Sequence, residues 1–391
     1  MRRFITIILL FLLMAAAYTP AHAEGFIFGD ETKGALFTAD DAKLNIRLGL
    51  QPRLDYGEII KSKDGNSYSN DKDLYMRAIA LDLRGNLNEN IRYCLVIVAD
   101  KYDKANFNNQ VNILFSYMEW LASPGFGLMI GKEKLPFSRI SLSSTFVQLF
   151  IERPVSSETA KKAFGKTDVV YHNPKLEARG GLLEGVVRYY ASVSEGWTVG
   201  EPIQSNRTVY KGGLLYAGRL ELAPPDWVEA IRSDAHIGRG KHLSFGIDYA
   251  VQPTIIYNET DYKEKRALWS VDLSGHYKGF TGQIEYNEWR ADSEDPAIAD
   301  TNPKGWYAQA AYIILPLYIE PAVRYEVFDQ DSKNSGKKER TTTLGVNWYL
   351  KGHSLKSSLN WVHTKYDVNA TGKLPGDDDK DIYQLQAQML F

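Results

Sequence analysis

The chain has 391 residues, and its 46 lysines and arginines nearly balance its 48 aspartates and glutamates, for a formal net charge of −2. This balance excludes a general nucleic-acid binder, because such proteins carry a clustered excess of basic side chains. The single cysteine, Cys94, excludes an internal disulfide framework and a C-x-x-C-H haem attachment.

The first 23 residues have the pattern of a secretory signal peptide. Arg2 and Arg3 form a basic start, residues 4–17 form an apolar run, and Ala21-His22-Ala23 is a small-residue cleavage site. The alternative, an uncleaved anchor helix, is disfavoured because the apolar run is too short to span a bilayer. We therefore predict export and cleavage after Ala23, followed by an N-terminal periplasmic lead at 24–42.

The mature chain has the alternation of one-sided strands. After residue 23 no apolar stretch approaches the roughly 20 residues that a membrane helix needs. A membrane-spanning mature chain must then be a closed β-barrel, whose backbone is satisfied in lipid. Apolar and polar side chains alternate with a period of two, most clearly in 44–51, 243–251, 319–327, 342–350 and 381–391. An export signal and a chain ending with Phe391 on the apolar parity are typical of an outer-membrane barrel.

The connections between these segments alternate in length. The long ones cover 55–73, 101–109, 133–166, 195–208, 253–266, 291–304, 329–340 and 366–380. The short ones centre on 86–90, 123–125, 172–181, 278–279, 315–318 and 351–353. Because bacterial barrels have long extracellular loops and short periplasmic turns, we predict an all-β fold over 43–391, a transmembrane antiparallel β-barrel of about 16 strands. One link departs from the rule, since 223–241 is long and could hold a short helix at Asp226–Ser233.

The longest connection, 133–166, carries more apolar surface than an exposed loop usually does. Leu135, Phe137 and Phe150 are examples. We therefore predict that this third extracellular loop folds into the lumen and packs on the inner wall.

The same segment is basic. Ammonium and guanidinium groups bind oxyanions, and passage needs several such sites of moderate strength. The candidates for an anion path through the constriction are Lys132, Lys134, Arg139 and Arg153. For the first three, an equal alternative is that they fix the loop, for example by pairing with Glu133 or Glu152.

Several motifs resemble those of the phosphate-selective porin O and P family. They are Gly131-Lys-Glu-Lys-Leu-Pro-Phe-Ser138, Phe150-Ile-Glu-Arg-Pro154, Leu44-Asn-Ile-Arg-Leu-Gly-Leu-Gln-Pro-Arg53, Arg324-Tyr-Glu-Val-Phe-Asp-Gln-Asp331 and Leu344-Gly-Val-Asn-Trp-Tyr349. The resemblance implies a homotrimer of sixteen-stranded barrels in which a basic third loop forms the constriction. It implies that Lys132 or Lys134 takes the role of the family's third-loop lysine in oxyanion binding.

The family's lumenal arginine ladder would correspond to inward-phase arginines. These are Arg47, Arg53, Arg84, Arg188, Arg219 and Arg324. The same phase also carries Asp82, Asp100, Glu184, Asp248, Asp272, Glu285, Glu320 and Glu326, so no uninterrupted basic stripe is visible. The alternative for each wall arginine is an ion pair with a neighbouring carboxylate that stiffens the wall.

The combined interpretation is an outer-membrane porin for small hydrophilic solutes that prefers anions such as phosphate. Its expected partners are outer-membrane lipid, small anions and two further copies of the chain, without nucleic acid. Three alternatives stay open: a non-selective general diffusion porin, a barrel that sheathes a partner such as a multihaem cytochrome, and an outer-membrane hydrolase using Ser274 and His276. No nucleophile motif such as G-x-S-x-G is present, so we expect no catalytic residues, cofactor or metal site.

Overall fold

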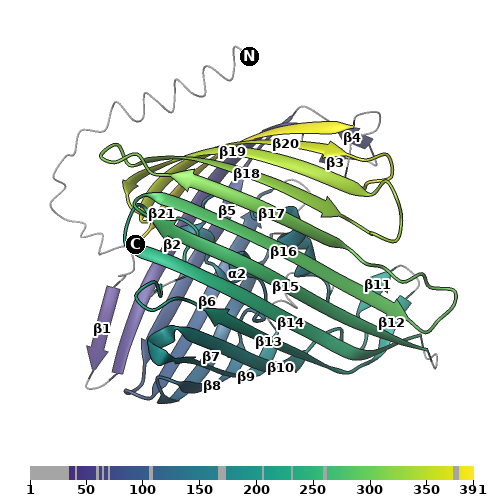
Figure 1. Cartoon of the computed structure of the whole chain (residues 1–391), viewed down its shortest axis with the longest axis horizontal. Coiled ribbons are helices and arrows are strands. Elements are labelled where there is room, and N and C mark those ends of the chain that lie inside the picture. The colour runs from purple at the N-terminus through teal and green to yellow at the C-terminus, as the bar shows by residue number, and fades with distance from the viewer. Residues whose placement is uncertain are drawn as a thin grey trace.

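The computed structural model describes residues 35–39, 42–58, 61–63, 66–68, 71–104, 109–165, 173–204, 207–229, 232–258, 262–372 and 378–391. Within these ranges sixteen strands form a closed antiparallel barrel, as predicted (Figure 1). They are β2 (Ala42–Gly57), β5 (Asp71–Asn86), β6 (Ile91–Tyr102), β7 (Val111–Ser123), β8 (Phe126–Lys132), β9 (Pro174–Leu182), β10 (Val187–Glu195), β13 (Leu214–Leu222), β14 (Lys241–Tyr257), β15 (Lys263–Tyr277), β16 (Phe280–Ser293), β17 (Lys304–Tyr312), β18 (Ile319–Asp329), β19 (Lys338–Lys351), β20 (Leu355–Tyr366) and β21 (Asp379–Leu390).

Shorter elements accompany the barrel. The additional strands are β1 (Ala35–Ala39), β3 (Lys61–Lys63), β4 (Asn66–Tyr68), β11 (Pro202–Gln204) and β12 (Arg207–Gly212). The helices are α2 (Arg139–Leu142), η1 (Thr145–Val147), α3 (Val155–Ala160) and η3 (Leu183–Gly185). Across the described ranges, every helix is too short or too polar to cross a membrane.

The barrel closes between its first and last strands. β2 pairs with β5 on one side and with β21 on the other, where Gly49 lies opposite Leu390. Beyond the end of β21, the amide of Phe391 still donates to the carbonyl of Leu48 at 3.0 Å, and Leu48 donates back at 2.6 Å. Phe391, the residue that indicated a barrel in the sequence, therefore takes part in the closing ladder.

β1 extends the sheet along the first part of β2. Ala35 pairs with Ile46 and Ala39 with Ala42. The predicted lead at 24–42 thus contains a strand, whereas the predicted signal peptide at 1–23 lies outside the described residues.

The burial pattern is the reverse of that in a water-soluble protein. On β14, Leu243 and Tyr249 are 39% and 50% exposed, whereas His242 and Asp248 are 1% and 3% exposed. An outward apolar face and an inward polar face suit a strand between lipid and a polar lumen.

Two expectations about the connections were wrong. The segment predicted as a turn at 172–181 belongs largely to β9, and the turn before β10 lies at Leu183–Gly185. Gly180, within the predicted turn, is in the ladder, where a Cβ would lie 2.0 Å from the carbonyl oxygen of Gly125. The described part of the possible helix at Asp226–Ser233 is not helical.

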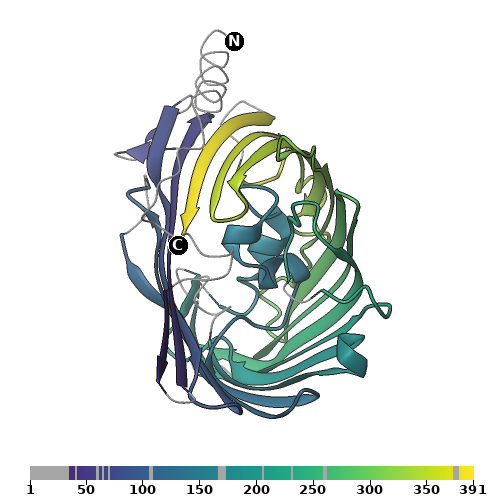
Figure 2. The same ribbon diagram turned by 90° about the vertical axis from the view of Figure 1, so that its left-hand side faces the viewer.

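The described part of the loop between β8 and β9, residues 133–165, lies inside the ring of strands (Figure 2). Glycines on the inner wall mark the points where the loop approaches the wall most closely. A Cβ at Gly49 would lie 2.3 Å from the Phe146 ring, and one at Gly305 would lie 2.6 Å from the Cβ of Ser156. The wall has no side chain at these points because the loop occupies that space.

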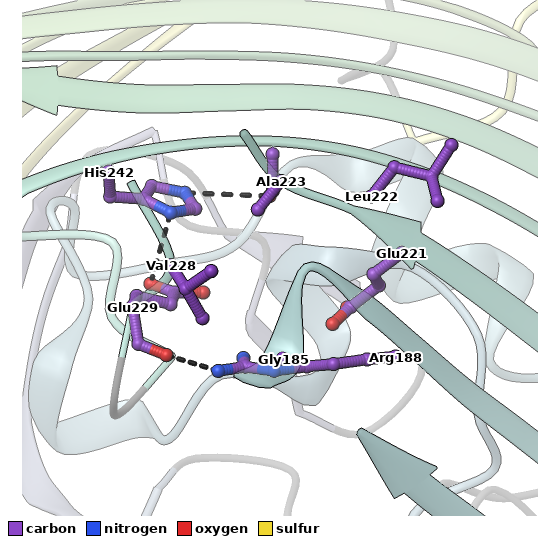
Figure 3. A pocket seen from close by; sticks show the side chains of 9 residues that line it. Gly185, Arg188, Glu221, Leu222, Ala223, Val228, Glu229 and His242 are labelled. Atoms are coloured by element: carbon purple, nitrogen blue, oxygen red, sulfur yellow. Dashed lines mark hydrogen bonds and ion pairs between the residues drawn. The ribbon is translucent and has the colours of Figure 1, made fainter. Parts of the chain in front are cut away.

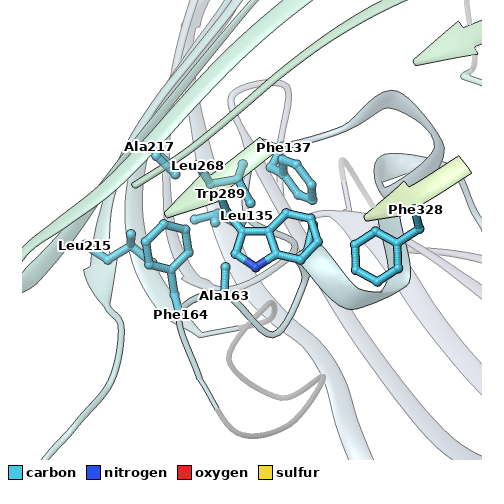
Figure 4. Close-up of a cluster of buried hydrophobic side chains, with 11 residues drawn as sticks. Leu135, Phe137, Ala163, Phe164, Leu215, Ala217, Leu268, Trp289 and Phe328 are labelled. Carbon is cyan, nitrogen blue, oxygen red and sulfur yellow. The ribbon is translucent and has the colours of Figure 1, made fainter. Parts of the chain in front are cut away.

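Apolar contacts hold the loop against β13 to β18. Phe137, Phe164 and Leu135 of the loop cluster with inward side chains of the wall (Figure 4). The wall residues are Leu215, Ala217, Ala250, Leu268, Trp289 and Phe328. The apolar residues of this segment therefore fill part of the lumen, which is the packing that their number in the sequence predicted.

Candidate functional site

The loop is fixed to the opposite end of the barrel by a buried ion pair. Arg139, at the start of α2, is 1% exposed and donates to both carboxylate oxygens of Glu229 at 2.5 and 2.8 Å. It also donates to the carbonyl of Ser233 at 3.2 Å. Burial alone would raise the pKa of the Glu229 carboxyl, but the Arg139 guanidinium lowers it to about 2.

The tip of the loop is fixed by a second set of contacts. Arg53 donates to the Glu152 carboxylate at 2.5 Å, and Arg324 donates to the Glu152 carbonyl at 2.8 Å. Asn347 donates to the carbonyl of Leu149 at 2.7 Å. Glu152 is thus held by two strands of the wall, β2 and β18, which fixes the position of this part of the loop.

Two of the predicted anion-path residues brace the loop internally. Lys134 donates to the carbonyls of Leu142 and Ser143 at 3.0 and 2.7 Å. Arg153 donates to the carbonyls of Ile140 and Ser143 at 3.0 and 2.8 Å. Burial lowers the pKa of the Lys134 ammonium well below its ordinary value, and the nearby Arg153 charge lowers it further.

The carboxylates expected to pair with this group have other partners. Glu133 accepts from Arg179 at 2.6 Å, and Glu152 accepts from Arg53. The partner of Arg139 is instead Glu229, which comes from a distant connection. The loop-fixing alternative therefore describes the contacts of Lys134 and Arg139, although through different acceptors.

Lys132 faces away from the lumen. In the ladder it lies opposite Ser116 and Pro174, on the same parity as Ile130, which is 65% exposed. The inward parity of β8 is that of Met129, which is fully buried. This placement differs from the expectation that Lys132 lines the anion path.

The six wall arginines all lie on the inward parity, and three of them are buried. Arg53, Arg219 and Arg324 are 2%, 3% and 3% exposed. Arg219 contacts the carboxylates of Asp248 and Asp272 at 2.5 and 2.7 Å and that of Glu221 at 2.8 Å. These arginines have the wall-stiffening contacts that the alternative described.

The remaining wall arginines are more open. Arg47 and Arg84 share one carboxylate, Asp82, and their side chains are 20% and 45% exposed against 14% for Asp82. Arg188 donates to the backbone carbonyl of Glu229. Two guanidinium groups on one carboxylate leave a local excess of positive charge on this part of the wall.

Arg179 on β9 is a lumenal cation that the sequence analysis missed. It contacts Glu119 at 2.7 Å and Glu133 at 2.6 Å, and it lies 5.5 Å from the centre of the Tyr117 ring. The predicted turn at 172–181 hides its inward position on a strand. The signal was present, since Lys175, Glu177 and Arg179 alternate with apolar neighbours.

A small pocket lies at the short-turn end of the lumen, between η3, β13 and the connection that follows it (Figure 3). Its lining includes Arg188, Glu221, Glu229 and His242. Figure 3 shows Arg188 reaching the Glu229 backbone and His242 lying beside the Glu229 carboxylate. Nδ1 of His242 is 3.9 Å from the nearer carboxylate oxygen of Glu229.

The serine considered for hydrolysis contacts a different histidine from the one expected. Ser274 Oγ lies 2.9 Å from Nε2 of His242, not of His276. The carboxylate nearest His242 is Glu229, which is engaged by Arg139. Ser274 and His242 are 4% and 1% exposed, so this pair lies within packed structure.

A sixteen-stranded barrel with an apolar exterior, a polar interior and an inward loop defines an outer-membrane porin. The sequence agrees, because the family model described as "Phosphate-selective porin O and P" matches residues 46–391. The chain belongs to this family.

Two relatives illustrate its range. A protein of Aquifex aeolicus described as "Uncharacterized protein" is 31% identical over 378 residues, which cover 89% of this chain and 87% of that protein. "Porin O" of Pseudomonas aeruginosa is 24% identical over 162 residues, which cover 33% of this chain and 36% of that protein.

Solved porin structures share the fold. The "Anion-selective porin from Comamonas acidovorans" has a TM-score of 0.64 at 15% identity, covering 90% of this chain and 100% of that one. OmpF of Salmonella typhi, solved with daunomycin, has a TM-score of 0.60 at 11% identity, with 91% and 100% coverage. OmpT of Vibrio cholerae in its trimer form has a TM-score of 0.57 at 8% identity, with 90% and 100% coverage. At these identities the likeness concerns the fold.

Proposed function

We propose that this porin passes small hydrophilic solutes and prefers anions, phosphate and other oxyanions among them. The observation that carries the proposal is the pair Arg47 and Arg84 on the single carboxylate of Asp82. An arginine that is 45% exposed beside a shared carboxylate can exchange that contact for a passing oxyanion. The name of the family and that of the Comamonas porin are consistent with this preference.

We further infer a homotrimer in the outer membrane, exported by a signal peptide cleaved after Ala23. The trimer form of OmpT supports the oligomer, and the 1–23 pattern supports cleavage. The expected observations are an oligomeric band on unheated gels and an N-terminus at Glu24.

A weakly selective diffusion porin is the second candidate. It is favoured by Arg53, Arg219 and Arg324, whose charges are neutralised by buried carboxylates and leave little net field in the lumen. A barrel that sheathes another protein is disfavoured, because the loop packs against the inner wall and occupies space that a partner would need.

The test is the reversal potential of single channels in planar bilayers across a KCl gradient, with phosphate as a competitor. Anion preference and a phosphate-dependent fall in chloride current are expected. Cation preference without a phosphate effect would overturn the selectivity and leave the pore.

Arg84→Gln and Lys132→Gln form a matched pair of variants, since each removes one positive charge. The first change is inside the lumen and should reduce anion preference, whereas the second is outside and should leave it unchanged. If both variants changed the anion preference equally, the effect would not depend on the lumenal position of Arg84.

A further inference from the structure

The long connection between β13 and β14 enters the barrel from the short-turn end. Its described parts are 223–229 and 232–240, here called the turn-side segment. The amides of Asp234 and Ala235 donate to the carbonyl of Val147 at 3.2 and 3.1 Å. Ser143 donates to the Asp234 carboxylate at 2.7 Å. The turn-side segment therefore meets the loop between β8 and β9 within the lumen.

Apolar side chains pack together where the turn-side segment contacts the loop. Ala235 and Ile237 are 0% and 3% exposed. They cluster with Leu149 and Phe150 of the loop and with Ala311, Ile313, Ala322 and Tyr349. Removing these apolar side chains from water favours the packed position of the segment over one in solvent.

Polar contacts also hold the turn-side segment in this packed position. Arg139 of the loop binds the Glu229 carboxylate from one side, and Arg188 of β10 binds its carbonyl from another. His353, in the turn before β20, contacts the carbonyl of Ala235 at 2.9 Å. Loop, wall and turn-side segment are thus joined at one level of the barrel.

The turn-side segment also places a charge in the lumen. Arg232 donates to Glu221 at 2.6 Å and to the Tyr190 hydroxyl at 3.3 Å. Its side chain is 16% exposed, which is comparable with Arg47 and Arg179. A connection that only joined two strands would not need to bury apolar residues or carry an inward cation.

We propose that the turn-side segment is a second constricting element, which narrows the channel from the short-turn end and is latched to the loop by the Arg139–Glu229 ion pair. Conductance is then set jointly by two inward segments, one from each end of the barrel. Releasing the latch widens the path without changing the wall.

The direct test replaces residues 226–239 with a two-residue Asn-Gly turn and measures single-channel conductance. We expect a rise of roughly 1.5-fold or more, because the narrowest part of a water-filled pore dominates its resistance. The control shortens the external connection 295–301, which should leave conductance unchanged. Heat-dependent gel mobility and circular dichroism check that both barrels fold.

A second measurement works without deletion. In a Cys94→Ser background, Ala235→Cys places a thiol at a position that is fully buried when the segment is seated. A charged thiol reagent should label it slowly, and Glu229→Gln should raise the labelling rate on the order of tenfold by breaking the latch. Val368→Cys, at a position 73% exposed, sets the rate for a free thiol.

These outcomes separate the present inference from the function proposed above. Unchanged conductance in the shortened variant, or rapid labelling of Ala235→Cys without the Glu229 change, would overturn the second constriction. Absence of anion preference in the unmodified channel would affect only the proposed selectivity.

Discussion

Two parts of the inner wall are built in different ways. On β13 to β18, side chains such as Leu215, Leu268 and Trp289 point inward and pack against the loop as a soluble protein packs its core. On β2 and β5, Arg47, Asp82 and Arg84 keep part of their surface open. The difference shows that this lumen is partly a folded interior, so a charge can guide solutes only where the wall is left uncovered.

The largest expected effect concerns the packed part. Glu229→Gln leaves the Arg139 guanidinium buried without its charge partner, which should cost about 3 to 5 kcal/mol of unfolding free energy. Denaturant titration in detergent micelles measures it. The exposed pair Lys333–Asp300 at 2.9 Å is the control, where Lys333→Gln should cost at most about 1 kcal/mol. Equal losses of unfolding free energy in the two variants would mean that burial does not strengthen the Arg139–Glu229 pair.

A smaller effect is expected where the loop touches the wall. Gly49→Ala places a methyl group against the Phe146 ring, at 2.3 Å before any adjustment. Such overpacking should destabilise the seated loop by about 1 to 3 kcal/mol. Gly218→Ala is the control, because its nearest neighbour lies 3.5 Å away. Proteolysis of the loop measures the change, and identical rates in both variants would contradict the close approach.

Acid should weaken the packing of the turn-side segment against the loop and the wall. Burial lowers the pKa of His236 to about 2 and that of His353 to about 3, below the ordinary 6.5. Both favour the seated state as neutral groups, so their stabilisation is present above pH 6.5 and is lost as the pH falls below it. Burial raises the pKa of Asp234 to about 6, which opposes this trend between pH 6 and 4. Because acid removes the stabilisation of two histidines and adds that of one carboxyl, the packed segment loses stability overall.

The other charged or titratable groups around the turn-side segment include Arg139, Arg153, Arg188, Glu221, Glu229, Arg232, Arg239, His242, His276 and Lys356. Between pH 7 and 5 we expect the labelling rate of Ala235→Cys to rise on the order of tenfold, after correction for thiol ionisation. His236→Gln should flatten this dependence. If the labelling rate fell as the pH was lowered, protonation of Asp234 would outweigh that of the two histidines.

The sequence by itself determined the barrel. Alternation of apolar and polar side chains allows one arrangement in lipid, since every strand must place its apolar parity outward and the sheet must close. It also indicated the inward loop, because Leu135, Phe137 and Phe150 need an apolar partner. The outward direction of Lys132 was in principle readable, because Phe126, Leu128 and Ile130 precede it on the same parity.

Only the tertiary structure decided which charges are free. Arg139 and Glu229 lie 90 residues apart, and nothing local in the sequence pairs them. The inward course of the turn-side segment depends on the same contacts, because Ala235 and Ile237 are buried by residues from the loop and from β17, β18 and β19. Parity gives the face of each side chain, but its partners depend on segments that meet across the lumen.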